Sequence, residues 1–176
     1  DYNSVSLNKS NAYLFVPSFL TSKDISKIKE LSLYCKGFYA DGLSGLYLAE
    51  SLNKPFIAGL GLNVFNSTDA SALFSEGAQA VVLSKELSLG QAMQTSDGCA
   101  VFTRGNIRLM ELLYCPFGKK CANCNRGNDF VLRDELGHEF KLRRYKLNGR
   151  CRFEIYNDAI LFYSTKQPQS ELINLV

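Results

Sequence analysis

Short apolar runs alternate with helix-type segments through the first hundred residues, and this alternation constrains the fold more than any other feature. Strand-like runs lie at residues 12–16, 37–40, 55–59 (running on toward 62) and 79–83. Between them, apolar residues at helical spacing predict three helices. Alternating strands and helices are typical of a parallel sheet or barrel, and four such units are half of a (β/α)8 barrel. We therefore expect an α/β fold with a partial (β/α) TIM-barrel-like half over residues 1–100; a small open sheet is the alternative.

Local signals mark the ends of these helices. Thr21 stands where an N-cap belongs, with an acid three residues later, and Gly77 follows residues 69–76 as a left-handed C-cap. Ser84 and Ser88 are candidate caps for a short helix that runs through Met93.

The pattern changes after residue 99. Residues 99–103 read as a strand, and residues 104–115 fit either a strand or a helix. Two hairpins are expected, over 130–142 with its turn at 134–137 and over 150–163 with its turn at Asn157-Asp158. The tail, 164–176, reads as loop and then a short helix. Residues 101–176 should form an antiparallel β section pinned by cysteines and packed as one unit with residues 1–100.

Four of the six cysteines have a spacing that suits a metal site. The set is C-x5-C-x2-C-x26-C, formed by Cys115, Cys121, Cys124 and Cys151. Four thiolates complete either a zinc site or an iron–sulfur cluster. A disulfide with two spare thiols, or four unrelated buried cysteines, are the alternatives. Cys35 and Cys99 read as buried small residues next to strands.

Charge separates the two parts of the chain. Residues 1–99 carry 7 Lys and Arg against 9 Asp and Glu, whereas residues 100–176 carry 13 against 8. A basic cysteine-bearing half could attract phosphate backbones, or its charges could simply be solvated. No apolar run approaches the about 20 residues that a membrane helix needs, so no membrane partner is expected. With no signal segment, the cysteines favour a reducing cytoplasm, and the opening without Met suggests a piece of a longer protein.

A protease mechanism is difficult to build from these residues. His138 is the single histidine and falls in a predicted turn, exposed and with no evident partner. The sequence contains no HExxH motif, and a zinc held by four thiolates keeps no open position for water. No catalytic residue is assigned from the sequence.

Several short motifs follow one another along the chain. They are Asn63-Val-Phe-Asn66-Ser67, Val82-Leu-Ser84-Lys-Glu86-Leu-Ser88, Arg104-Gly105 with Leu109-Met110 and Tyr114-Cys115-Pro116, Leu132-Arg133-Asp134 with Gly137, and Cys151-Arg-Phe-Glu154-Ile. In this order they resemble the motifs of the peptidase U32 (collagenase-like) family. The resemblance covers residues 38–161. It implies a (β/α)-barrel-like core, of which this chain looks like a carboxy-terminal portion, completed by the rest of the protein or by a second chain. Some members were described as collagen-degrading peptidases. Others are similar to proteins needed to hydroxylate RNA or ubiquinone precursors, with a [4Fe–4S] cluster on four cysteines.

On this resemblance Cys115, Cys121, Cys124 and Cys151 would hold the cluster, with zinc as the alternative occupant. We therefore expect an iron–sulfur protein that supports hydroxylation or modification of RNA or a metabolite. A U32 peptidase and a structural zinc domain are the alternatives. Substrate-binding candidates lie at or just past predicted strand ends, although helix capping or surface pairing would explain each of them equally well: Asn63, Asn66, Ser84, Glu86 and Arg104.

Overall fold

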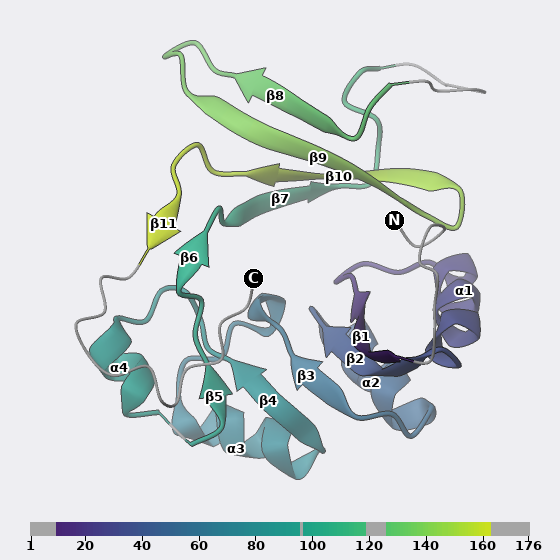
Figure 1. Ribbon diagram of the computed structural model, residues 1–176, viewed down its shortest axis with the longest axis vertical. Coiled ribbons are helices and arrows are strands. Elements are labelled where there is room, and N and C mark those ends of the chain that lie inside the picture. The colour runs from purple at the N-terminus through teal and green to yellow at the C-terminus, as the bar shows by residue number, and fades with distance from the viewer. Residues whose placement is uncertain (1–9, 96, 119–125, 163–176) are drawn as a thin grey trace. The chain divides into compact units, whose positions relative to one another are not determined.

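The computed structural model describes residues 10–95, 97–118 and 126–162 (Figure 1). Within these ranges the chain divides into two compact units. We call the part up to Thr103 the βα unit and the part from Arg104 to Phe162 the β unit.

The βα unit is built on a parallel sheet of five strands that follow one another in chain order. The strands are β1 (Ser10–Val16), β2 (Cys35–Ala40), β3 (Phe56–Ala58), β4 (Ala78–Val82) and β5 (Cys99–Ala100). The helices are α1 (Ser22–Ser32), α2 (Leu43–Ser51), α3 (Ser67–Ser75) and α4 (Leu89–Met93).

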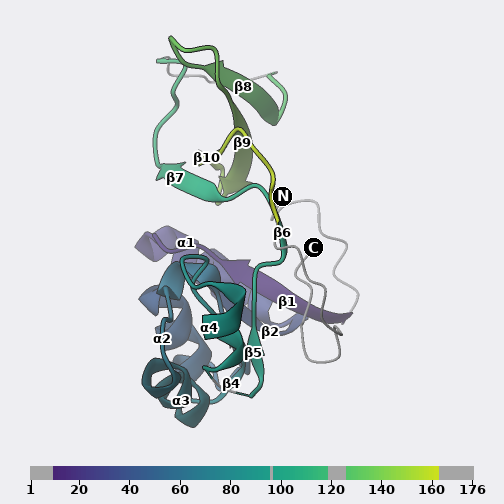
Figure 2. The ribbon, with the colours of Figure 1, turned by 90° about the vertical axis from the view of Figure 1, so that its left-hand side faces the viewer.

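Sequential parallel strands joined by crossovers of one hand put every connecting helix on the same face of the sheet. Figure 2 shows the four helices together on one side. The main core lies between sheet and helices, where Ile28, Phe38, Leu48 and Val81 are fully or almost fully buried. The α/β class and the parallel sheet are thus confirmed. The sheet is not closed in the described residues, so completion of a barrel stays a prediction.

The capping signals are largely confirmed. Thr21 forms a capping box at the start of α1, and Ser88 forms one at the start of α4. Gly77 follows α3 with φ +95°. Two local predictions were wrong. Residues 60–62 form the 3-10 helix η1 (Leu60–Leu62) rather than more strand, and Ser84 caps no helix because its hydroxyl bonds Asn63.

The β unit is a four-stranded antiparallel sheet in the order β7-β10-β9-β8. Its strands are β7 (Arg108–Leu112), β8 (Asp129–Arg133), β9 (Glu139–Leu147) and β10 (Arg150–Tyr156). A separate pair joins β6 (Arg104–Gly105) to β11 (Leu161–Phe162).

One of the two predicted hairpins is correct. The turn at 134–137 joins β8 to β9, with Gly137 N–H donating to the Asp134 carbonyl at 3.1 Å. The hairpin at Asn157-Asp158 is wrong, because the strand beyond it pairs with β6 and not with β10. The partner of β10 is β9, through a turn at Asn148-Gly149. Both turn residues have positive φ, 50° and 74°, as a type I′ turn requires.

Successive residues of a strand point to opposite faces, which gives this sheet two unlike sides. One side carries an apolar cluster of Leu112, Leu142 and Phe153, on which Phe117 and Phe130 pack. The other side carries ion pairs, Arg152 with Glu111 at 3.2 Å and Arg108 with Glu154 at 3.0 Å. We call these the apolar face and the polar face of the β unit.

Candidate metal centre and strand-end residues

Cys115 and Cys151 lie at the same end of the antiparallel pair β7–β10. In this pair Phe153 is registered with Leu112. Cys115 follows Leu112 by three positions and Cys151 precedes Phe153 by two. Because the strands run in opposite directions, the end of β7 meets the start of β10. The sheet therefore brings together two candidate ligands that are far apart in the sequence.

Both cysteines share one apolar environment. Each is a free thiol and is partly buried against the cluster of Leu112, Leu142 and Phe153. The ring of Phe117 lies 4.8 Å from that of Phe130 and 6.0 Å from that of Phe153, measured between centroids. These rings form an aromatic floor next to the thiols.

The other two candidate ligands, Cys121 and Cys124, lie outside the described residues. The chain on either side of them is held together. The Arg126 guanidinium lies 4.6 Å from the centroid of the Phe117 ring, and Arg144 on β9 donates a hydrogen bond to the Arg126 carbonyl. The Arg144 N–H also donates to the Asn128 carbonyl at 2.6 Å. The described residues on either side of this segment, Phe117 and Arg126, are therefore in contact beside the aromatic floor.

Arg144 holds the chain that follows this segment, at Arg126 and Asn128, against β9. Its side chain belongs to the apolar face, and the residue is only 7% exposed. A buried guanidinium needs acceptors, which Asn128 Oδ1 at 3.2 and 3.3 Å and the Arg126 carbonyl supply. The charge thus ties the start of β8, and the chain just before it, to β9.

These residues fit a thiolate-bound metal. Free, partly buried thiols beside aromatic rings give the water-poor setting that such centres use, and nearby cations offset their negative charge. Arg126 is one such cation, and Lys146 is registered directly opposite Cys151. No group of three or more potential ligands occurs within the described ranges, which contain only half of the predicted set.

At the carboxyl end of the parallel sheet, the structure brings two of the five strand-end candidates into contact. The Ser84 hydroxyl donates to Asn63 Oδ1 at 2.7 Å and accepts from the Glu86 N–H at 3.3 Å. Asn63 has φ 52° and ends η1. Asn66 instead caps α3 by accepting from the Asp69 N–H at 2.8 Å. The Asn63–Ser84 pair is therefore the part of this prediction that stays a candidate for substrate contact.

Within the described residues, Glu86 reaches that pair only with its backbone N–H, which donates to the Ser84 hydroxyl. Glu86 is exposed. Arg104 belongs to the β unit, where it is exposed and registered with Phe162 of β11.

Sequence reasoning missed a third polar residue at this sheet edge, Asp41. It directly follows β2 and is only 3% exposed. Its Oδ1 accepts from the Gly61 N–H at 2.9 Å, and the Ser18 hydroxyl donates to its carbonyl at 2.7 Å. A Cβ on Gly61 would lie 2.2 Å from that carbonyl oxygen, so only glycine fits there. The signal in the sequence was an acid immediately after a buried strand.

His138 is exposed, as predicted, but it has a partner. Its Nδ1 lies 2.9 Å from Asp134 Oδ2 across the hairpin turn, with the two side chains 51% and 38% exposed. The hydrogen bond with Asp134 raises the pKa of His138, and the same bond lowers the pKa of Asp134. Cys35 is buried and Cys99 partly buried, and both lie within strands of the βα unit.

No protein-family model, curated protein or solved structure matches this chain. The resemblance to the peptidase U32 family therefore rests on its sequence motifs. Among the described residues, no helix has the length and apolar character needed to cross a membrane.

Proposed function

We propose that the β unit carries an iron–sulfur centre on Cys115, Cys121, Cys124 and Cys151, in a cytoplasmic protein that supports hydroxylation or modification of RNA or a metabolite. The observation that supports it best is the register of β7 and β10, which sets Cys115 and Cys151 at one end of the sheet. The contact between Phe117 and Arg126, which flank the segment with Cys121 and Cys124, adds to this support. Bound there, such a cluster would supply electron transfer or a Lewis-acidic iron.

The test of the metal centre is anaerobic purification and reconstitution with ferrous iron and sulfide. We expect about four irons and four sulfides per chain, with the broad visible absorption of thiolate-bound iron. Cys115→Ser and Cys151→Ser should each lose most of the bound iron. Cys99→Ser is the matched control, because that thiol lies in the βα unit, and it should retain the full content.

Two other results would change the proposal. One zinc per chain with no colour, lost in the same two variants, would keep the ligands but make the centre structural. Metal content unchanged by Cys115→Ser and Cys151→Ser would reject the site itself.

The modification activity is tested in the full-length protein by comparing target hydroxylation in RNA between the parent protein and Cys151→Ser. Loss of hydroxylation in a folded variant supports the redox role. The peptidase alternative is weaker here, because a base needs burial and orientation next to a nucleophile. His138 sits on an exposed turn, with Asp134 as its ring partner. Cleavage of gelatin that survives in Cys151→Ser would favour the peptidase instead.

The proposal includes a partner for the βα unit, either the rest of a longer protein or a second chain that completes the barrel. Its support is the face of the sheet opposite the helices. There, Phe15 and Tyr39 are registered with each other and stack with centroids 5.8 Å apart, and Ile57 continues the row. All three are only half-buried. Light scattering of the purified chain would distinguish a self-associating half-barrel from a monomer.

A further inference from the structure

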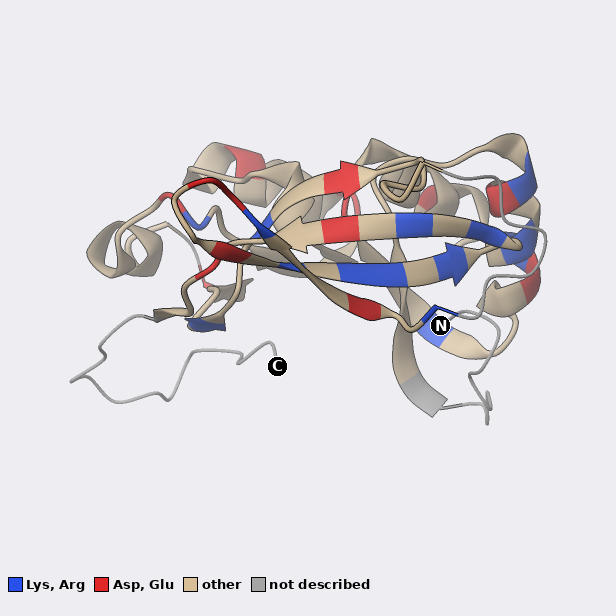
Figure 3. Ribbon diagram, turned by 90° about the horizontal axis from the view of Figure 1, so that it is seen from above, with Lys and Arg blue, Asp and Glu red and all other residues tan. Residues whose placement is uncertain are grey.

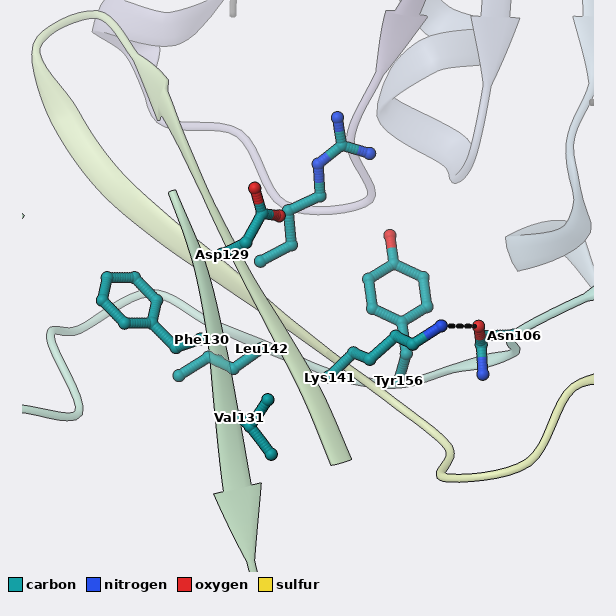
Figure 4. Close-up of a pocket in the computed structure, with 8 residues that line it drawn as sticks. Asn106, Asp129, Phe130, Val131, Lys141, Leu142 and Tyr156 are labelled. Atoms are coloured by element: carbon teal, nitrogen blue, oxygen red, sulfur yellow. Dashed lines mark hydrogen bonds between the residues drawn. The ribbon is translucent and has the colours of Figure 1, made fainter. Parts of the chain in front are cut away.

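The polar face of the β unit contains an open groove of about 510 Å³. Most of its lining comes from side chains of three adjacent strands, β8, β9 and β10: Asp129, Val131, Lys141, Arg143 and Tyr156, with Asn106 at one end (Figure 4). All of them belong to the β unit.

Basic residues are concentrated on β9 and β10, two of the strands that line the groove. β9 carries four Lys and Arg residues against one acid, and β10 carries two against one. Figure 3 shows Lys and Arg as blue segments along neighbouring strands of this sheet. Arg144 and Arg152 are buried and serve the fold, whereas Lys141 and Arg143 are exposed and line the groove.

Lys141 and Arg143 form a regular pair of cations. They lie two positions apart on one strand, so they share a face at a separation of about 7 Å along it. That spacing is comparable to the distance between neighbouring phosphates of an extended single strand. Asn106 Oδ1 accepts a hydrogen bond from Lys141 Nζ at 2.7 Å, and the Asn106 side chain is itself fixed by donating to the Asn157 carbonyl at 3.0 Å.

Tyr156 provides an aromatic surface beside these cations. It is registered directly opposite Lys141, and Figure 4 shows the two side chains next to each other. Its hydroxyl donates to Glu154 Oε2 at 2.7 Å, which fixes the ring. Burial and this bond raise the pKa of Tyr156, so the phenol stays neutral beside a polyanion. A fixed ring can stack on a base of any identity.

We propose that this groove binds a segment of single-stranded RNA, with phosphates on Lys141 and Arg143 and a base on Tyr156. The choice of RNA as the polymer rests on the proposed function. The combination of paired cations with a stacking ring is typical of surfaces that bind single strands without reading their sequence. Asp129, registered opposite Arg143, is the one acid in the lining and can accept a hydrogen bond from a base amino group.

The groove is separate from the cysteine site. Tyr156 and Cys151 lie five positions apart on β10, which is about 17 Å along a strand, and Cys151 belongs to the apolar face with Phe153. The groove therefore docks the RNA chain and does not hold the group that reacts.

The experiment measures binding of a fluorescent, mixed-sequence RNA of about 10 nucleotides to the full chain by anisotropy over a series of salt concentrations. The groove variant is Lys141→Gln with Arg143→Gln. For single strands each phosphate contact contributes about 0.7 to the slope of log affinity against log salt. Two lost contacts should flatten the slope by about 1.4. If parent and variant bind equally at 1 M salt, this slope difference makes the affinity of the variant about 25-fold lower at 0.1 M salt. Tyr156→Leu should weaken binding at every salt concentration and leave the slope unchanged.

The matched control is Lys23→Gln with Lys29→Gln, which removes the same charge from exposed positions of α1. It should bind nearly as the parent does. Equal losses in control and groove variants would show only a general charge effect and overturn the proposal, as would RNA binding too weak to detect. Displacement of the RNA by an acidic peptide at lower concentration than by unlabelled RNA would identify the groove as a peptide site instead.

The same titration with Cys115→Ser separates this inference from the proposed function. RNA binding that persists in a variant without iron leaves the groove standing on its own. An iron centre that forms in the Lys141→Gln, Arg143→Gln variant leaves the metal proposal standing when the groove fails.

Discussion

Replacing Arg144 by Met should loosen the chain around the predicted metal ligands while the sheet itself stays intact. Met keeps the length and most of the apolar stem of the arginine but donates no hydrogen bond. The side chain of Arg144 donates to two acceptors in the chain just before β8, the Arg126 carbonyl and Asn128 Oδ1. The backbone bond from Arg144 N–H to the Asn128 carbonyl remains.

The magnitude follows from opposing effects. A hydrogen bond from a charged group contributes about 1.5–3 kcal/mol, so the bonds to these two acceptors together contribute about 3–6 kcal/mol. Arg126 and Asn128 are exposed, so water replaces part of each bond, and Met also removes the cost of burying a charge. A net loss of about 2 kcal/mol for local opening is expected, which is about thirtyfold in the opening equilibrium.

Hydrogen exchange of the metal-free protein measures this opening directly, through peptides that span residues 126–133. Exchange there should rise about thirtyfold in Arg144→Met. Metal affinity, measured by cobalt titration, should fall about 10–100-fold, as it does when groups that position ligands are removed. The control is Arg143→Met, an equal change at the neighbouring exposed position. Equal exchange rates in the two variants would show that the Arg144 side chain does not hold residues 126–133 against β9.

Three further outcomes follow from particular residues. Gly149→Ala should lower stability by about 1 kcal/mol, because alanine is strained at φ 74°; Gly127→Ala, where a Cβ meets nothing within 4 Å, should leave the melting temperature unchanged. Ser84→Ala should cost about 1 kcal/mol by urea unfolding through lost hydrogen bonds, and an unchanged midpoint would contradict that role. NMR titration should give His138 a pKa above its ordinary 6.5, and Asp134→Asn should return it toward that value. Because the pKa of His138 is raised and that of Asp134 lowered, their pairing stabilises the turn between the two values; it is lost as pH rises through the first or falls through the second.

The parallel sheet could be predicted from the sequence because its signals are local. Each strand is a short apolar run, and each helix has its own period and caps, so no knowledge of distant partners is needed. Thr21, Gly77 and Ser88 behave as predicted for this reason. Ser84 does not, because its hydroxyl bonds Asn63, which lies on a neighbouring loop, and a contact of that kind has no signature in the local sequence.

The antiparallel part was harder to predict because its pairings connect distant residues. The strand after Asn157 leaves the sheet and pairs with β6, more than fifty positions earlier in the chain. By contrast, the turn at Asn148-Gly149 was visible in the sequence, since Asn-Gly is a strong signal for a type I′ hairpin. Because this turn was not predicted, the predicted strand ends at residue 142, five positions before the observed end of β9 at Leu147.

That missed turn also bears on the candidate metal centre. A two-residue turn fixes the register of β9 against β10, and a slip of one position would move every side chain of β10 to the opposite face. In the observed register Cys151 and Phe153 share the apolar face with Cys115, while Arg152 and Glu154 share the polar face with Glu111 and Arg108. A slipped strand would place Cys151 among ion pairs and bury Arg152 against the aromatic floor. Both changes are unfavourable, so the side chains of both faces stabilise the observed register. The C-x2-C step of the motif is local, but the contribution of Cys151 depends on this register, and the turn at Asn148-Gly149 is therefore as much a part of the proposed site as the ligands.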